Sequence, residues 1–356
     1  MESEDHDVGF VSSLGEVSLH GGYVQQLEVS CKAEKFPTPS GMNRTHFLRF
    51  TADALAHALF TTGRAPGDTA DHGWTSVFEW LHRVALMPAY LRRRPDGRIA
   101  RTDLARELDR SEKVALSYAV GQAMTGIFAT QLLDVRFLMH VDRYGGSYQL
   151  VVPPKTKSRP DLFGQRRNGG WVVAEAKGRS TPIDTDLKNK MRLQKRMIRS
   201  VAGVPPEIAY GCCAYFAKGT NGEEWLRMYA VDPLENEPEA IDFRVSSPDH
   251  FIAAYYAPFL AAIKAGEQVR DAESDYLTAS FGPFGIRVSI LRSVAERVRA
   301  AQGGRMPGLW SEVLDLLPGS AEWEIAPGRF ADGTGVATTW EGALAQGDWG
   351  GVDERW

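Results

Sequence analysis

Asp161, Glu175 and Lys177 are the residues of this chain whose types and spacing best suit chemistry. Asp161 follows a proline, while Glu175 and Lys177 lie two positions apart at the end of the apolar run 171–177. Alternate side chains of a strand share a face, so we expect Glu175 and Lys177 to point the same way. Two adjacent carboxylates are unfavourable unless a cation lies between them, so a divalent metal site is indicated if Asp161 joins Glu175.

The positions around these residues predict a β-hairpin. The run 171–176 reads W-V-V-A-E-A and has glycines on both sides, which is typical of a buried strand. A second short strand is expected at 161–164, and the Asn-Gly pair at 168–169 is the signal of a tight turn between the two strands. Pairing of the strands brings Asp161 beside Glu175. The alternative is a surface hairpin with a plain salt bridge, but a solvated hairpin would not need an apolar run ahead of the acid.

Pro160-Asp161 and Glu175-Ala176-Lys177 together resemble the PD-(D/E)xK signature of the restriction-endonuclease-like nucleases. The resemblance covers the middle of the chain and implies an α/β fold with a restriction-endonuclease-like core, in which a mixed sheet is flanked by helices. In that family the two acids and the carbonyl of the residue between Glu and Lys, here Ala176, hold Mg²⁺, for which Mn²⁺ can substitute. The lysine assists the attacking water. The resemblance therefore implies a Mg²⁺-dependent endonuclease acting on nucleic acid, most often DNA, with Asp161, Glu175 and Lys177 as its catalytic residues.

A further acid joins the metal in several branches of this family, from the helix that precedes the sheet. Glu112 is the candidate by position, in the first turn of a helix predicted from Ser111, its expected N-cap, to about residue 133. The alternative role of Glu112 is to complement the dipole of its own helix, and we favour that alternative.

The charge distribution around the motif favours a nucleic-acid partner. Between positions 153 and 199 the chain has 13 Lys or Arg and 4 Asp or Glu, although its formal net charge is −4. Such a basic band beside an acid pair is expected where a phosphate backbone is held. A helix is predicted at 184–201, and its apolar stripe contains one amide, Gln194, at a place where nuclease relatives often direct a Gln or Lys over the active site. Beside this stripe we expect a basic face that follows the nucleic-acid strand, formed by Lys188, Arg192, Lys195 and Arg199.

Three regions are expected along the chain. Residues 1–98 predict a largely helical N-terminal region, residues 99–233 the nuclease core and residues 234–356 an accessory α+β region. The N-terminal region is expected to hold one helix from residue 44 and a second that buries Trp74, Val77, Phe78, Trp80, Leu81 and Val84. Strands of the core are expected at 135–141, 148–152, 161–164, 171–177, 210–217 and 226–231. In the accessory region we expect helices at 249–268 and 289–301 and strands at 276–281 and 284–290.

Composition and motifs limit the compartment and the partners. The three cysteines lack metal-ligand spacing and indicate a reducing compartment. No signal peptide and no apolar run long enough to cross a membrane is visible. We therefore expect a cytoplasmic protein without a membrane partner. No P-loop is present, so an ATP-driven step would need a partner ATPase or sensor protein. A homo-oligomer and roles in restriction, anti-phage defence or repair are left open. Two alternatives also stay open: a catalytically silent nuclease-like module that binds nucleic acid or a partner protein, and an unrelated fold.

Overall fold

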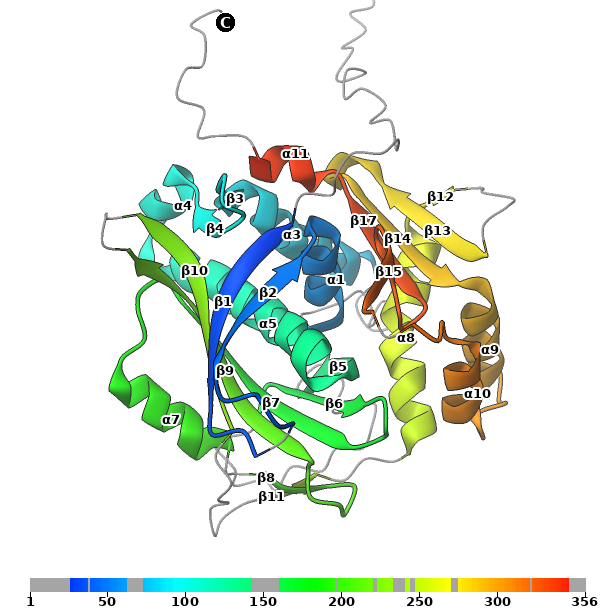
Figure 1. Ribbon diagram of the computed structural model, residues 1–356. Coiled ribbons are helices and arrows are strands. Elements are labelled where there is room, and N and C mark those ends of the chain that lie inside the picture. Colours follow the sequence, from blue (N-terminus) through cyan, green and yellow to red (C-terminus); the bar gives the residue numbers. More distant parts are fainter. Residues whose placement is uncertain are drawn as a thin grey trace, which may run out of the picture.

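The computed structural model describes residues 26–37, 39–62, 73–141, 160–195, 198–219, 223–232, 241–243, 247–269, 275–320 and 322–345 (Figure 1). The strand expected at 148–152 lies outside these residues. The helices with the longest spans are α1 Ala52–Thr62, α3 Trp74–Tyr90, α5 Arg110–Leu133, α7 Thr185–Lys195, α8 Pro248–Ala265, α9 Arg292–Gln302 and α10 Leu309–Leu316. Shorter helices are α4 Asp103–Glu107, the 3-10 turn η2 Gly282–Phe284 and α11 Trp340–Ala345.

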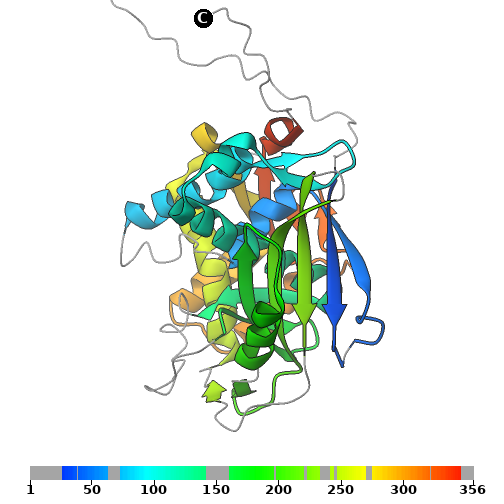
Figure 2. The same ribbon diagram turned by 90° about the vertical axis from the view of Figure 1, so that its left-hand side faces the viewer.

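The central sheet has seven strands in the order β2-β1-β10-β9-β7-β6-β5. These are β1 Leu27–Glu34, β2 Thr45–Phe50, β5 Val135–His140, β6 Leu162–Arg166, β7 Trp171–Arg179, β9 Ile208–Lys218 and β10 Glu224–Val231. β5, β6 and β7 form an antiparallel meander, β9 runs parallel to β7, and β1 runs parallel to β10. Figure 2 shows β1 and β10 side by side within this sheet. The sheet is therefore mixed, and the predicted α/β class is confirmed.

Helices α5 and α7 cover opposite faces of this sheet beside β7. A Cβ atom at Gly178 in β7 would overlap the carbonyl oxygen of Ser117 in α5, so this position faces α5. A Cβ atom at Gly211 in β9 would lie 3.1 Å from the Cβ atom of Met191 in α7. Gly211 is the register partner of Glu175 in β7, so the two positions face the same side. It follows that Glu175 and its alternate neighbours face α7, whereas Gly178 faces α5.

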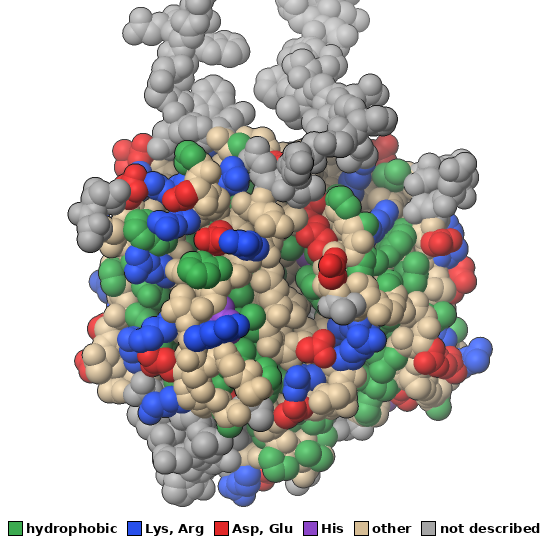
Figure 3. Space-filling model, viewed as in Figure 1, with side chains coloured by type: hydrophobic (Ala, Val, Ile, Leu, Met, Phe, Trp, Pro, Cys, Tyr) green, Lys and Arg blue, Asp and Glu red, His purple; other side chains and the backbone are tan. Residues whose placement is uncertain are grey.

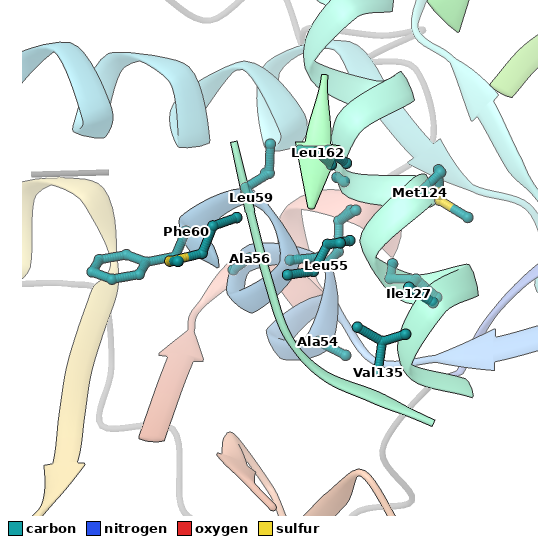
Figure 4. Close-up of a cluster of buried hydrophobic side chains, with 14 of the residues drawn as sticks. Ala54, Leu55, Ala56, Leu59, Phe60, Met124, Ile127, Val135 and Leu162 are labelled. Atoms are coloured by element: carbon teal, nitrogen blue, oxygen red, sulfur yellow. The ribbon is translucent and has the colours of Figure 1, made fainter. Parts of the chain in front are cut away.

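The largest apolar core extends through most of the described structure, and one part of it lies between α1, α5 and the central sheet. Figure 4 shows Leu55 of α1, Ile127 of α5 and Val135 of β5 gathered in this core. A Cβ atom at Gly126 in α5 would lie 2.6 Å from the side chain of Thr62 in α1, so a glycine is what permits the two helices to approach this closely. Each fully buried Leu or Ile contributes on the order of 1.5–3 kcal/mol, so this packing fixes α5 against the sheet.

A second sheet, built from the C-terminal part of the chain, has six strands in the order β12-β13-β14-β17-β16-β15. These are β12 Glu267–Val269, β13 Tyr276–Phe281, β14 Ile286–Leu291, β15 Glu324–Ala326, β16 Arg329–Phe330 and β17 Thr334–Thr338. Two small pairs complete the fold: β3 Leu91–Arg93 with β4 Ile99–Arg101, and β8 Ile198–Val201 with β11 Ile241–Phe243. Figure 1 shows α8 and α9 beside this second sheet.

A buried polar network joins the second sheet to α1. The carboxylate of Asp332 is fully buried, and it accepts hydrogen bonds from the hydroxyl of Tyr255 at 2.5 Å and from the backbone N–H of Thr334 at 3.0 Å. Nε2 of His57 in α1 lies 3.2 Å from the same carboxylate. Burial raises the pKa of Asp332, but the adjacent His57 and the hydrogen bonds outweigh it, so the pKa is lowered overall. The C-terminal sheet is therefore anchored inside the molecule.

Two expectations for the N-terminal region are wrong. The helix expected from residue 44 begins at Ala52, because Thr45–Phe50 is strand β2, in which the buried Leu48 and Phe50 alternate along the pairing with β1. In α3 the side chains of Trp74 and Phe78 are 59% and 61% exposed, although both were expected to be buried. The other four expected positions, Val77, Trp80, Leu81 and Val84, are buried. The buried stripe of α3 is therefore narrower than its apolar stripe.

Three element boundaries also differ from the expectations. The N-cap of α5 is Asp109 rather than Ser111. The helix expected at 184–201 ends at Lys195, and Ile198–Val201 is a strand that pairs with β11. The helix expected at 289–301 begins at Arg292, because Ser289 still belongs to β14. The remaining predicted elements of the core and of the accessory region are confirmed within these described residues, with ends shifted by a few positions.

The three expected regions stay predictions, but the sheet crosses the first boundary. β1 lies before residue 98 and yet pairs with β10 in the middle of the central sheet. None of the helices in the described part of the chain combines the length and the apolar character needed to cross a membrane.

Candidate active site

The predicted hairpin is formed by β6 and β7. Gly169 has a φ of 85°, the left-handed conformation that glycine adopts without strain, and its N–H donates to the carbonyl of Arg166 at 2.9 Å. The strands then pair with Leu162 opposite Ala174. The next position along each strand places Asp161 beside Glu175. The local turn chemistry therefore fixes the register that brings the two acids to the same end of the hairpin.

Asp161 contacts the segment of β7 that carries Glu175 and Lys177. Oδ2 of Asp161 accepts a hydrogen bond from the backbone N–H of Ala176 at 2.8 Å. Nζ of Lys177 donates to Oε1 of Glu175 at 2.7 Å. One carboxylate is thus held against the backbone of β7, and the other is held by the neighbouring ammonium.

Glu175 is the most strained of these groups electrostatically. It is only 5% exposed, and burial raises its pKa, although the charge and the hydrogen bond of Lys177 counteract this rise. Its second oxygen, Oε2, is buried and has no hydrogen-bond partner among the residues that the structure describes. A buried carboxylate oxygen without a partner is costly, by about 1–3 kcal/mol or more, so native proteins usually satisfy it with a donor, water or a cation.

The backbone of Ala176 offers a further oxygen on the same side. In an extended strand the N–H and the C=O of one residue point in the same direction across the sheet. Because the N–H of Ala176 points to Asp161, its carbonyl points to that side as well. Asp161, Glu175 and Ala176 therefore offer the hard oxygen ligands that Mg²⁺ and Mn²⁺ prefer, and the donor set fits such an ion.

The described residues contain no larger ligand cluster. No group of three or more His, Cys, Asp or Glu side chains in this part of the chain is arranged to hold a metal ion. The three cysteines are buried free thiols whose pKa values are raised by burial, which is typical of unreactive thiols. An ion at the hairpin would depend on two carboxylates and one backbone carbonyl.

Glu112 is engaged at the start of α5. Its carboxylate accepts a hydrogen bond from the backbone N–H of Asp109 at 3.0 Å, while the carboxylate of Asp109 accepts from the N–H of Glu112 at 3.0 Å. This reciprocal pair is a capping box, which stabilises the N-terminus of the helix. The local role that we favoured for Glu112 matches this geometry.

The residues expected to contact nucleic acid are less clearly placed. Nζ of Lys188 lies 4.8 Å from the ring centroid of Tyr229 in β10, two strands away from β7. Arg192, Gln194 and Lys195 belong to α7, but their side chains lie outside the described residues. The structure therefore does not bring Lys188 to the acids, and the roles of the other three stay predictions.

Some cations of the basic band have acidic partners. Arg166 pairs with Glu207, and Arg179 pairs with Asp184 at 3.0 Å. On the face shown in Figure 3, acidic and basic side chains are interspersed. The surface charge is therefore more balanced than the count along the sequence indicates.

A polar cluster that the sequence did not reveal lies close by on the α5 face of the sheet. The hydroxyl of Tyr118 lies 3.0 Å from Nε2 of His140 and accepts a hydrogen bond from the Gln122 amide at 2.7 Å. His140 pairs with Leu162, the residue after Asp161. A polar residue at the end of a buried strand was the available signal, but its partners come from a distant helix.

Comparisons of the chain with protein-family models, with curated proteins and with solved structures found no match.

Proposed function

We propose that this chain is a Mg²⁺-dependent nuclease with a restriction-endonuclease-like core. It hydrolyses phosphodiester bonds of nucleic acid, with DNA as the favoured substrate. The observation that carries the proposal is the buried Oε2 of Glu175, for which the described part of the chain supplies no hydrogen-bond partner. The order of elements supports it: α5, the meander β5-β6-β7, α7, and β9 parallel to β7. This order of helix, strands, helix and strand is the one that the resemblance implies.

The roles of the residues follow from their contacts. Asp161, Glu175 and the carbonyl of Ala176 would hold the ion. When bound, Mg²⁺ supplies charge relief to the phosphate and lowers the pKa of a water molecule. The Lys177 ammonium is held at the site by Glu175, 2.7 Å away, where it can orient the attacking water or neutralise charge that develops on the phosphate.

Single substitutions that preserve shape test these roles. We expect the wild-type protein to cleave DNA with Mg²⁺ or Mn²⁺ and to be inactive in EDTA. Asp161→Asn, Glu175→Gln and Lys177→Met should each lower the cleavage rate by roughly 100-fold or more, because each removes a metal ligand or the ammonium held beside the ligands. Glu112→Gln is the matched control, since that carboxylate serves the cap of α5, and it should cleave like wild type. Linear, circular and single-stranded DNA, and RNA, should be assayed in parallel.

A separate readout tests metal binding without activity. Mg²⁺ should raise the melting temperature of the wild-type protein but not that of Glu175→Gln, because a ligand that binds only the folded state stabilises it. Cleavage that survives all three active-site substitutions would refute the assignment of the site. Nucleic-acid binding without cleavage or a Mg²⁺-dependent shift would favour the catalytically silent module instead.

A further inference from the structure

A groove lies where α5 extends past the end of β7. The helix packs on β7 through Ser117 and Gly121, whose backbones approach Lys177 and Gly178 so closely that a Cβ atom at either glycine would overlap its neighbour. α5 begins about two turns before Ser117, at Arg110, whereas β7 ends at Arg179. The first turns of α5 therefore have no strand beneath them. The space left between them and the segment after β7 measures about 370 Å³.

The lining of this groove is positively charged. Its walls are formed by Arg110, Lys113 and Val114 from α5, and by residues 178–181, which include Arg179, Ser180 and Thr181. No acidic side chain lines it within the described residues. Three cations and the hydroxyl groups of Ser117, Ser180 and Thr181 around a cavity of this size are the donors that proteins use for a phosphate group.

The cations contributed by α5 are available for a ligand. Among the residues that the structure describes, neither Arg110 nor Lys113 forms an ion pair, and the nearby carboxylates of Asp109 and Glu112 are engaged in the capping box. Arg179 is partly neutralised by Asp184, at 3.0 Å. A solvated basic face would show cations spread over a convex surface, whereas here they surround a hollow.

The groove lies close to the candidate active site along β7 but on the other face of the sheet, since Gly178 faces α5 whereas Glu175 faces α7. Glu175, Lys177 and Arg179 are alternate residues of β7, so they follow one another along one face of the strand. Both Lys177 and Arg179 lower the pKa of Cys213 through their charge, against the stronger effect of its burial, and Cys213 packs with Met191 of α7, so this is the face that carries both cations. From Glu175 to Arg179 the strand rises by about 13 Å, which is within the reach of one bound nucleic-acid strand.

We propose that this groove binds a backbone phosphate of the nucleic acid a few nucleotides from the cleaved bond, which rests on the proposed nuclease function. Arg110 and Lys113 are the main ligands, and Ser180 and Thr181 donate hydrogen bonds to the same phosphate. The contact positions the strand and reads no base sequence. The strand then passes from the active site on the α7 face around the carboxyl end of β7 to the N-terminus of α5.

A binding assay in EDTA tests this groove independently of cleavage. The test variant is Arg110→Gln/Lys113→Gln, and the control is Arg287→Gln/Arg299→Gln, which removes the same charge from exposed positions of the C-terminal sheet and α9. The affinity for a labelled DNA duplex should be measured by fluorescence anisotropy from 50 to 300 mM salt. Each phosphate that is no longer neutralised lowers the salt slope by about 0.9, so the groove variant should lose about 1 unit of slope and bind roughly 10-fold more weakly at 0.1 M salt.

The outcomes separate the groove from the nuclease assignment. Arg110→Lys/Lys113→Arg should bind like wild type, and in cleavage assays the Gln variant should raise KM with little change in kcat. Unchanged slope and affinity in the Gln variant, or an equal loss in the control, would overturn the groove while leaving the active site untouched. A slope loss in a protein that never cleaves would support the groove and refute the nuclease.

Discussion

The ion pair between Lys177 and Glu175 predicts a measurable coupling within the candidate site. Lys177→Met would leave a carboxylate that is 5% exposed with neither oxygen hydrogen-bonded, since Oε2 already lacks a partner. Removing one partner of a buried pair costs about 3–5 kcal/mol. The side chain of Lys177 is 25% exposed, so water already screens this ion pair. We therefore expect a smaller loss of stability, about 2–3 kcal/mol. The folding equilibrium constant would then fall by roughly 30- to 160-fold.

Glu175→Gln tests the cause of this loss. Because burial raises the pKa of Glu175, its charged form is disfavoured in the folded protein, and a neutral amide should be neutral or stabilising in EDTA. In the Glu175→Gln background, Lys177→Met should cost less than about 1 kcal/mol, since no buried charge is left unpaired. The coupling between the two substitutions is therefore expected to be about 2 kcal/mol.

Urea denaturation at pH 8 in EDTA measures all four members of this cycle. Lys190→Met, at an exposed position of α7, serves as the matched control and should change stability by less than about 0.5 kcal/mol. The loss in Lys177→Met should also shrink as the pH falls towards 4.5, because protonation of Glu175 removes the buried charge. Equal costs of Lys177→Met in both backgrounds would refute the claim that the two side chains depend on one another.

Two further predictions concern other parts of the fold. Gly178→Ala should destabilise the protein by about 1–3 kcal/mol in urea denaturation, because the added Cβ would force α5 away from β7. The control is Gly319→Ala, which should be neutral because no atom lies within 4 Å of the added Cβ. Equal effects of the two substitutions would contradict the packing argument. Burial raises the pKa of Asp53 from 3.8 to about 6, so the carboxyl group binds its proton more tightly in the folded state than in the unfolded state. The free energy of unfolding should therefore fall by up to about 3 kcal/mol as the pH rises from 4 to above 6. Asp53→Asn keeps an acceptor for Thr338 and should lack this part of the pH dependence in urea titrations at pH 4, 5, 6 and 7; an unchanged profile would show that Asp53 is not its source.

The hairpin could be predicted because its information is local. An Asn-Gly pair sets the turn, the apolar run sets the buried face, and together they fix the register that brings Asp161 beside Glu175. The pairing of Lys177 with Glu175 could be predicted equally well, since alternate residues of a strand share a face. The lack of a hydrogen-bond partner for Oε2 could not be read from the sequence, because it depends on everything packed around Glu175.

The errors arose where the sequence pattern fits two structures. Phe47, Phe50 and Ala54 are spaced as on a helix, but Leu48 and Phe50 also alternate as on a strand, and the pairing with β1 decides between them. Trp74 and Phe78 were expected inside because they are apolar, yet burial depends on which neighbours reach that flank of α3. The groove beside α5 depends on where a helix and a strand from different parts of the chain end.

The parallel pairing of β1 with β10 has a consequence for how the chain folds during synthesis. β1 is made early, but its partner Glu224–Val231 emerges only after nearly two hundred further residues have been added. Closing such a long loop makes native contacts slow to form, and until then β1 can pair with β2 on one side only, while its other edge stays open to other molecules. The interval between the synthesis of β1 and that of β10 is therefore the stage at which the growing chain is most exposed to aggregation through this edge.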